Sequence, residues 1–226
     1  MKKIFAIFAF LCAAVINIQA ERVFVGAEQT KLYLPLLKGK RVALLSNHTG
    51  IVIQGTDTIH TLDLLLKHGV EVTAIFSPEH GFRGTAREGE HVASSIDEKT
   101  GIPILSLYDG KSQRPSKESM QTFDILITDI QDVGLRFYTY YVTMYRLMNA
   151  CASEGKQFMV FDRPNPNGFY VDGPILDMKH KSGVGALPIP VVHGMTLGEL
   201  AQMINGENWL NDSMKVDLTV IPCKNY

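Results

Sequence analysis

The sequence has little cysteine and no excess of either charge. Of its 3 cysteines in 226 residues, Cys12 lies in an apolar N-terminal stretch. Cys151 and Cys223 are too few for a disulfide framework, and we expect both to be buried free thiols. The 22 Lys and Arg residues are balanced by 23 Asp and Glu residues, and no long basic run occurs. We therefore expect no nucleic-acid partner, since binding to a phosphate backbone requires a basic surface.

Several common catalytic motifs are also absent. The sequence contains no Gly-x-Ser-x-Gly elbow, no P-loop and no Gly-x-Gly-x-x-Gly turn, which argues against acyl transfer, nucleotide hydrolysis and dinucleotide binding. No thiolate cluster or close His-x-His spacing supports a zinc site, and oxygen-only metal ligation is not recognisable from spacing. We expect no metal and no cofactor. Acid/base chemistry on a polar, neutral substrate remains.

The first 20 residues have the pattern of a cleaved signal peptide. Lys2 and Lys3 precede an apolar stretch at residues 4–16, and the region ends in the small residue Ala20. The apolar stretch is shorter than the about 20 residues that cross a bilayer, and no second candidate follows it. We expect export, to the periplasm or out of the cell, with a mature chain that begins near Glu21 and has no stable membrane anchor.

The rest of the chain alternates apolar runs with amphipathic stretches. The apolar runs predict strands at residues 41–46, 72–77, 103–108, 124–129, 157–162 and 216–221. Helical spacing predicts helices at residues 58–68, 116–122, 139–153 and 196–205. This alternation indicates an α/β fold with a doubly wound, mostly parallel sheet and helices on both faces. The irregular stretch at residues 164–190, rich in proline and glycine, is expected to be a functional loop.

Polar and charged residues follow the ends of the predicted strands, where open α/β sheets bind their ligands. Each one alone is equally well explained as a solvated or capping residue, but their gathering at several strand ends favours a catalytic cleft. The candidates are Asn47 and His48; Glu79, His80 and Arg83; Asp129, Asp132, Arg136, Tyr138 and Tyr140; Asp162, Arg163 and Asn165; and His193.

Glu79 is the first candidate for proton transfer. A carboxyl group in a partly apolar pocket keeps its proton near neutral pH, and the neighbouring Pro and Gly residues let the backbone bend tightly. The alternative is an ion pair with Arg83. His80 is expected to bind the substrate, to orient Glu79, or to be structural.

The segment after the fourth predicted strand offers the next candidates. Asp129 and Asp132 are alternative catalytic carboxyls, and the planar guanidinium of Arg136 suits a substrate carboxylate. Tyr138 and Tyr140 either provide a surface on which sugar rings stack or belong to the core. Further along the chain, Thr196 and Glu199 match a capping box, so Glu199 is expected to begin a helix rather than to catalyse.

Five motifs stand in order along the chain: LLSNHTG at 44–50, SPEHG at 77–81, DIQDVG at 129–134 with RFYTY at 136–140, DRPNP at 162–166, and HGMT at 193–196. Together they resemble the exo-β-N-acetylmuramidase family, formerly a domain of unknown function. The resemblance implies a Rossmann-like catalytic domain, here residues 21–226. It also implies a peptidoglycan-recycling glycosidase that removes terminal N-acetylmuramic acid from the non-reducing end of wall fragments. Glu79 takes the position of the catalytic glutamate, and the other matching residues line the cleft.

Members of that family continue well beyond the strand that is expected to end at Ile221. We therefore expect the second, smaller domain to be missing or only begun in this chain. Two function classes follow. The first is a glycosidase with carboxyl acid/base catalysis on peptidoglycan-derived saccharides or muropeptides. The second is a non-catalytic periplasmic saccharide-binding module or an inactive fragment.

Overall fold

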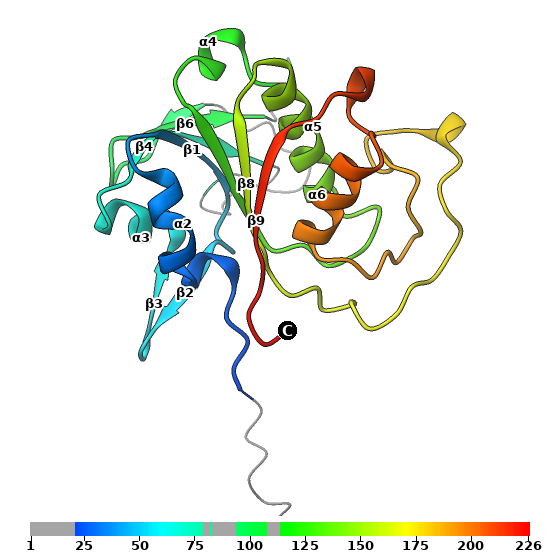
Figure 1. The fold of residues 1–226 in the computed structure, drawn as a ribbon, viewed down its shortest axis with the longest axis horizontal. Coiled ribbons are helices and arrows are strands. Elements are labelled where there is room, and N and C mark those ends of the chain that lie inside the picture. Colours follow the sequence, from blue (N-terminus) through cyan, green and yellow to red (C-terminus); the bar gives the residue numbers. More distant parts are fainter. Residues whose placement is uncertain (1–20, 79–81, 83–93, 108–113) are drawn as a thin grey trace, which may run out of the picture.

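The computed structural model describes residues 21–78, 82, 94–107 and 114–226 (Figure 1). The predicted signal peptide and the candidates Glu79, His80 and Arg83 lie outside the described residues. In the described part of the chain, no helix is both long enough and apolar enough to cross a membrane.

The described residues form a seven-stranded sheet in the order β5-β6-β4-β1-β7-β8-β9. Its strands are β1 (Arg41–Ser46), β4 (Glu71–Ser77), β5 (Ser95–Ile96), β6 (Pro103–Ser106), β7 (Ile125–Asp129), β8 (Gln157–Phe161) and β9 (Asp217–Ile221). All neighbours pair in parallel except the short edge strand β5. Without β5, the chain order of the strands is 3-2-1-4-5-6, the Rossmann-like order. The predicted fold class and all of the predicted strands are confirmed.

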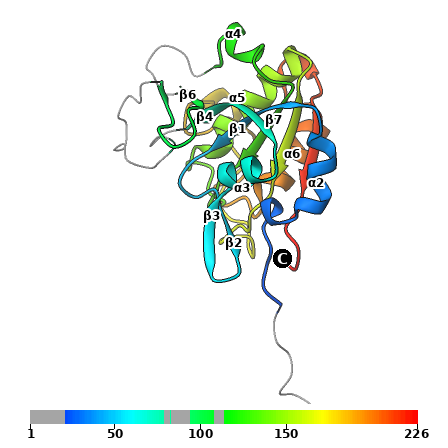
Figure 2. The same ribbon diagram turned by 90° about the vertical axis from the view of Figure 1, so that its left-hand side faces the viewer.

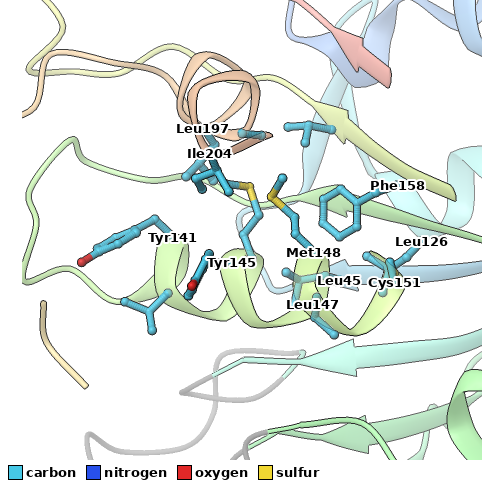
Figure 3. Close-up of a cluster of buried hydrophobic side chains, with 14 of the residues drawn as sticks. Leu45, Leu126, Tyr141, Tyr145, Leu147, Met148, Cys151, Phe158, Leu197 and Ile204 are labelled. Atoms are coloured by element: carbon cyan, nitrogen blue, oxygen red, sulfur yellow. The ribbon is translucent and has the colours of Figure 1, made fainter. Parts of the chain in front are cut away.

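Helices cover both faces of this sheet (Figures 1 and 2). The helices α2 (Thr30–Leu37) and α3 (Thr61–Lys67) share one hydrophobic core with the sheet, and α4 (Lys117–Met120), α5 (Tyr140–Ser153) and α6 (Leu197–Gly206) share the other. Adjacent strand residues point to opposite faces, so Leu44 enters the first core and Leu45 the second. Figure 3 shows Met148 and Cys151 of α5 beside Phe158 of β8.

The prediction of a helix over residues 58–68 was wrong at its start. Residues Asp57–His60 form β3, which pairs antiparallel with β2 (Ile51–Gln54), and α3 begins only at Thr61. Gly55 makes the hairpin turn with a φ of 63°, a conformation that glycine adopts without strain. The His60 ring accepts a hydrogen bond from the Leu62 amide at 3.1 Å and so caps α3. The other three predicted helices are confirmed.

The helix α2 was not predicted. Pro35 lies inside it, and Leu32 and Leu36 face solvent, so its sequence lacks a clean amphipathic pattern. Two short 3-10 turns also lay outside the predictions, η1 (Gly26–Glu28) before α2 and η3 (Asn211–Ser213) before β9.

The predicted long loop at residues 164–190 contains the 3-10 turn η2 (Met178–His180) and isolated β-bridges at Asp172, Ser182 and Gly185, but no longer helix or strand. Its return is held to the segment after β7, because Arg136 N donates to Val191 O at 2.8 Å and His193 N donates to Gly134 O at 3.1 Å. Gly134 has a φ of 72°, and a side chain there would collide with Asn165. The loop is therefore anchored close to the carboxyl ends of the strands.

The structure also tests the predicted capping box of α6 and the predicted state of the two cysteines. Thr196 and Glu199 form the expected capping box at the start of α6. Cys151 and Cys223 are both free thiols, as predicted, but only Cys151 is fully buried. Burial raises the pKa of the Cys151 thiol to about 12, so this thiol is inert.

Candidate active site

The candidate site lies where β1 and β7 run side by side and the chain leaves them in opposite directions. Such a switch point opens a crevice at the carboxyl ends of the strands. The last residues of the two strands, Ser46 and Asp129, are register partners, and the Ser46 hydroxyl donates to Asp129 O at 2.8 Å. This pairing brings together two of the predicted candidate segments, which begin at Asn47 and Asp129.

An ion pair between Asp129 and Arg163 lies buried at this end of the sheet. Arg163 Nε donates to Asp129 Oδ1 at 2.6 Å, and Arg163 Nη2 donates to Oδ2 at 3.1 Å. The Thr61 hydroxyl at the start of α3 also donates to Oδ2, and Arg163 Nη2 reaches Ile51 O at 3.0 Å. Both side chains are buried. Asp129 and Arg163 therefore hold β7, α3, β2 and the chain after β8 together, and neither presents a free charge to the cleft in this arrangement.

Asn47 is fully buried and links β1 to α5. Its side-chain amide donates to the Tyr140 hydroxyl at 2.9 Å, and its Oδ1 accepts from the backbone and the hydroxyl of Thr49. The Tyr140 ring meets the partly buried Tyr138 ring edge-on, with the centroids 4.8 Å apart. The next residue in the motif, His48, is exposed. Of this group, His48 and Tyr138 are the side chains accessible to a ligand.

Asp162 and Asn165 hold the segment before α6. Asp162 accepts hydrogen bonds from Thr196 Oγ1 at 2.7 Å and from the Gly198 amide at 2.8 Å, at the positive end of the helix dipole. Burial nevertheless raises the pKa of Asp162. Asn165 Nδ2 donates to Met195 O at 2.9 Å. Both residues therefore order the rim of the candidate site, that is, the segments that follow the carboxyl ends of the strands. They do so through contacts with backbone and hydroxyl groups.

Asp132 and His193 form a second buried pair. His193 Nδ1 accepts from the Met195 amide at 3.3 Å, which places the imidazole proton on Nε2, and Nε2 faces Asp132 Oδ2 at 3.8 Å. Asp132 Oδ2 already accepts from the Gly134 amide at 2.8 Å. Within the described part of the chain, Asp132 Oδ1 and His193 Nε2 are buried and have no hydrogen-bond partner.

The electrostatics of this pair suit proton transfer. Burial raises the pKa of Asp132 to about 6, although the amides of Gly134 and Val133 partly oppose the shift. Burial also lowers the pKa of His193, so the imidazole is neutral at pH 7. A carboxyl group that titrates close to neutral pH can give or take a proton under working conditions.

Arg136 is only partly exposed and anchors the long loop. Its Nη1 donates to Pro174 O and to Ile189 O, both at 2.7 Å. Nε and Nη2 make no hydrogen bond to a residue that the structure describes. One side of the guanidinium is therefore committed to the loop, and the other is available to a ligand.

The residues that flank Glu79 lie at the same edge of the sheet. Ser77 ends β4 and is buried, and the buried Phe82 ring meets the His60 ring edge-on with the centroids 5.0 Å apart. Glu79 lies between these two residues in the sequence, outside the described part.

Sequence reasoning missed three residues that hold the rim together. Thr61 donates to Asp129, Thr49 Oγ1 accepts from the Gln131 amide at 3.0 Å, and Gln131 Nε2 donates to Asp132 O at 2.6 Å and Pro164 O at 2.7 Å. Thr49 and Gln131 lie within the recognised motifs, which was the available signal. No local pattern marks Thr61, because its partner is 68 residues away. Among the described residues, no group of three or more His, Cys, Asp or Glu side chains could hold a metal ion.

The candidate residues of this site lie in a region that matches known proteins. Residues 42–226 match the family model described as exo-beta-N-acetylmuramidase NamZ, N-terminal. The chain is 47% identical over 196 residues to the protein of Bacillus subtilis (strain 168) named peptidoglycan beta-N-acetylmuramidase NamZ, a match that covers 86% of this chain and 45% of the relative.

Two solved structures of DUF1343 family proteins from Bacteroides fragilis NCTC 9343 have the same fold. One has a TM-score of 0.80 with 62% identity, and the match covers 91% of this chain and 53% of the solved chain. The other has a TM-score of 0.81 with 38% identity, and the match covers 91% of this chain and 51% of the solved chain. The chain thus spans about half the length of these relatives. With this sequence match and this fold, the chain belongs to the exo-β-N-acetylmuramidase NamZ family, whose N-terminal part it matches.

Proposed function

We propose that the protein is an exported glycoside hydrolase that releases terminal N-acetylmuramic acid from the non-reducing end of peptidoglycan fragments. The observation that supports this proposal is the 47% identity to the Bacillus subtilis relative, which is named a peptidoglycan beta-N-acetylmuramidase. The matched region includes every candidate residue of the rim. The substrates are peptidoglycan-derived saccharides or muropeptides, and the mature chain begins near Glu21. The reaction requires no cofactor.

The proposed chemistry uses two carboxyl groups with different roles. Glycosidases protonate the leaving oxygen with one carboxyl group while a second carboxylate or a substrate group stabilises the oxocarbenium-like transition state. We assign the acid to Glu79. Asp132 is the preferred partner, because its Oδ1 is unpartnered among the described residues and because, with a pKa of about 6, it is still mostly ionised at pH 7. Asp129 positions the site through Arg163 and Thr61 instead of reacting.

We assign recognition of the muramyl residue to Arg136. Its lactyl ether carries a carboxylate, and the Nε and Nη2 edge of Arg136 can donate two hydrogen bonds to one carboxylate. Arg163, the other arginine among the candidates of the described rim, is buried against Asp129. Arg136→Met should weaken binding of muramyl glycosides by about 1.5 to 3 kcal/mol and leave glucosaminyl glycosides unaffected. Equal losses for both glycosides would instead indicate a role in loop anchoring alone.

The direct test is product analysis with the complete gene product. The disaccharide with N-acetylmuramic acid at the non-reducing end is incubated with the protein, and free sugars are resolved by chromatography. The proposal expects free N-acetylmuramic acid from this disaccharide and no product from the reversed disaccharide, in which N-acetylglucosamine is terminal. A folded protein that binds the first disaccharide without cleaving it would overturn the proposal.

A saccharide-binding module is the second candidate function. It is supported by the observation that Asp129 and Asp162, two carboxylates of the described rim, are fully engaged in structural hydrogen bonds. A binding module needs no carboxyl group with a raised pKa. A pH–rate profile separates the two functions, since a glycosidase shows an acidic group that titrates above about pH 5.

A further inference from the structure

A groove of about 160 Å³ lies along α5, outside the rim described above. Its walls come from segments far apart in the sequence. Arg114 precedes α4, Tyr145 and Arg146 lie on α5, and Lys181 belongs to the long loop. Figure 3 shows Tyr145 on α5, one turn after Tyr141. None of these residues belongs to the recognised motifs.

The lining of this groove is strongly cationic. Of the described residues that line it, three are cationic, Arg114, Arg146 and Lys181, and none is Asp or Glu, in a protein whose net charge is -1. Within the described part of the chain, neither Arg146 nor Lys181 forms an ion pair or a hydrogen bond through its side chain. Nearby Lys179, in contrast, pairs with Asp177 at 2.7 Å. Arg146 and Lys181 repel one another in this hollow, so an anion between them would be stabilised by both.

The walls of the groove are already ordered. Tyr145 donates its hydroxyl to Trp209 O at 3.0 Å, and its ring lies 5.4 Å below Lys181 Nζ. Asn149 joins α5 to η3, since its amide donates to Tyr145 O at 2.9 Å and its Oδ1 accepts from Asn211 N at 2.7 Å. The helix that carries Arg146 is therefore held in place on this side, and little order has to be gained in this wall on binding.

We propose that this groove binds an oxyanion, a carboxylate or a phosphate group carried by a larger ligand. The volume suits one such group with its neighbouring atoms, and guanidinium groups match the planar pairs of oxygens in both anions. The Ser182 hydroxyl, which lines the groove and has no partner among the described residues, adds a neutral donor.

The anion has two chemical sources. Arg146 lies six residues after Tyr140, about 9 Å along the helix at 1.5 Å per residue. If the proposed function holds, the carboxylates of a peptide attached to the muramyl residue are within reach from the rim. The other source is phosphate, free or in a polymer, and this source is independent of the rim.

The test measures anion binding directly and needs no turnover, so it stands apart from the proposed function. Two probes, inorganic phosphate and N-acetyl-alanyl-glutamate, are titrated into the protein at low salt while NMR follows the backbone amides of Tyr145, Asn149 and Ser182. The variant Arg146→Gln/Lys181→Gln is compared with Lys31→Gln/Lys67→Gln, which removes the same charge from exposed positions on α2 and α3. Thermal unfolding confirms that both variants are folded.

We expect saturable binding that the groove variant weakens about tenfold or more, that the control variant preserves, and that added salt weakens. Binding of phosphate alone identifies a phosphate ligand, and binding of the dipeptide alone identifies a carboxylate ligand. Absence of saturable shifts with both probes overturns the proposal. Equal weakening in the groove and control variants also overturns it, because the effect would then be one of net charge.

Discussion

Two arginine–aspartate pairs bracket strand β7, and they differ in almost everything except their geometry. At its amino end, Arg41 Nη2 lies 2.7 Å from Asp124 Oδ1, and at its carboxyl end, Arg163 Nε lies 2.6 Å from Asp129 Oδ1. The first pair has side-chain exposures of 41% and 43%, and the second has 7% and 0%. The same two residue types thus lie in water at one edge of the sheet and in its interior at the other.

Of these two charged pairs, the buried one lies at the carboxyl end of β7, the end where the candidate site lies. Water competes for the exposed pair, and such pairs contribute between about 0 and 1 kcal/mol. The buried pair has lost its hydration and depends on its partners at every oxygen, as the contacts of Asp129 with Arg163 and Thr61 show. Buried polar networks rigidify their surroundings when they are fully satisfied. The carboxyl edge therefore holds its side chains in fixed positions, as a binding or catalytic site requires.

The largest effect on stability is expected from breaking the buried pair. Arg163→Met leaves the Asp129 carboxylate buried without its partner and should lower the free energy of unfolding by about 3 to 5 kcal/mol. Urea denaturation measures the change. The double variant Arg163→Met/Asp129→Leu should recover much of the loss, because no charge remains buried. A loss below about 1 kcal/mol in the single variant would mean that the pair behaves like a surface pair.

A smaller effect is expected from Asp132, and it depends on pH. Burial raises the pKa of Asp132 from 3.8 to about 6. Between these two values the carboxyl group keeps its proton in the folded state and has lost it in the unfolded state. The free energy of unfolding should therefore fall by roughly 2 to 3 kcal/mol as the pH rises from about 4 to about 6. Above pH 6 the contribution of Asp132 should no longer change.

The variant Asp132→Asn isolates this contribution. It cannot titrate, so the difference in unfolding free energy between the two proteins should change with pH only in that window. The surface carboxylates titrate in both proteins and cancel to first order, and His193→Gln introduced into both proteins removes the neighbouring imidazole from the comparison. A difference that is flat from pH 4 to pH 7 would show that Asp132 has an ordinary pKa.

The smallest effect is expected at the exposed pair. Arg41→Met should lower the free energy of unfolding far less than Arg163→Met does, and the cost should decrease further with added salt. Hydrogen bonds from the side chain and the backbone of Arg41 lower the pKa of Asp124 to about 2. This small contribution is present above about pH 4 and is lost as the pH falls toward 2. A cost equal to that of Arg163→Met would remove the distinction between the two edges.

The fold was predictable because its strands are continuous apolar runs. Leu44, Leu45 and Ile127 are buried on both faces of the sheet, a pattern that only covered, parallel strands show. The β2–β3 hairpin was missed because Thr58, Ile59 and His60 also fit the helical spacing of α3. Pairing with Ile51 and Val52 decides the matter, and that pairing is tertiary information.

The members of the candidate site were predictable, but their roles were not. Motif positions identified Asp129, Asp162 and Arg163 as rim residues. Whether each faces substrate or backbone depends on partners far along the chain, such as Thr61 for Asp129 and Thr196 for Asp162. The sequence also could not show that Asp132 and His193 approach each other, because the contact requires the long loop to return beside β7.

The most direct test of a catalytic carboxyl edge is the rate of Glu79→Gln in the complete gene product. Glutamine keeps the shape of the side chain but cannot donate a proton to the glycosidic oxygen. We predict a loss of kcat by about a hundred- to ten-thousandfold, with disaccharide binding and the melting temperature unchanged. If the variant keeps more than about a tenth of the rate, far above that loss, or if its melting temperature falls while turnover persists, Glu79 is not the acid. Asp132 then becomes the first candidate for that role.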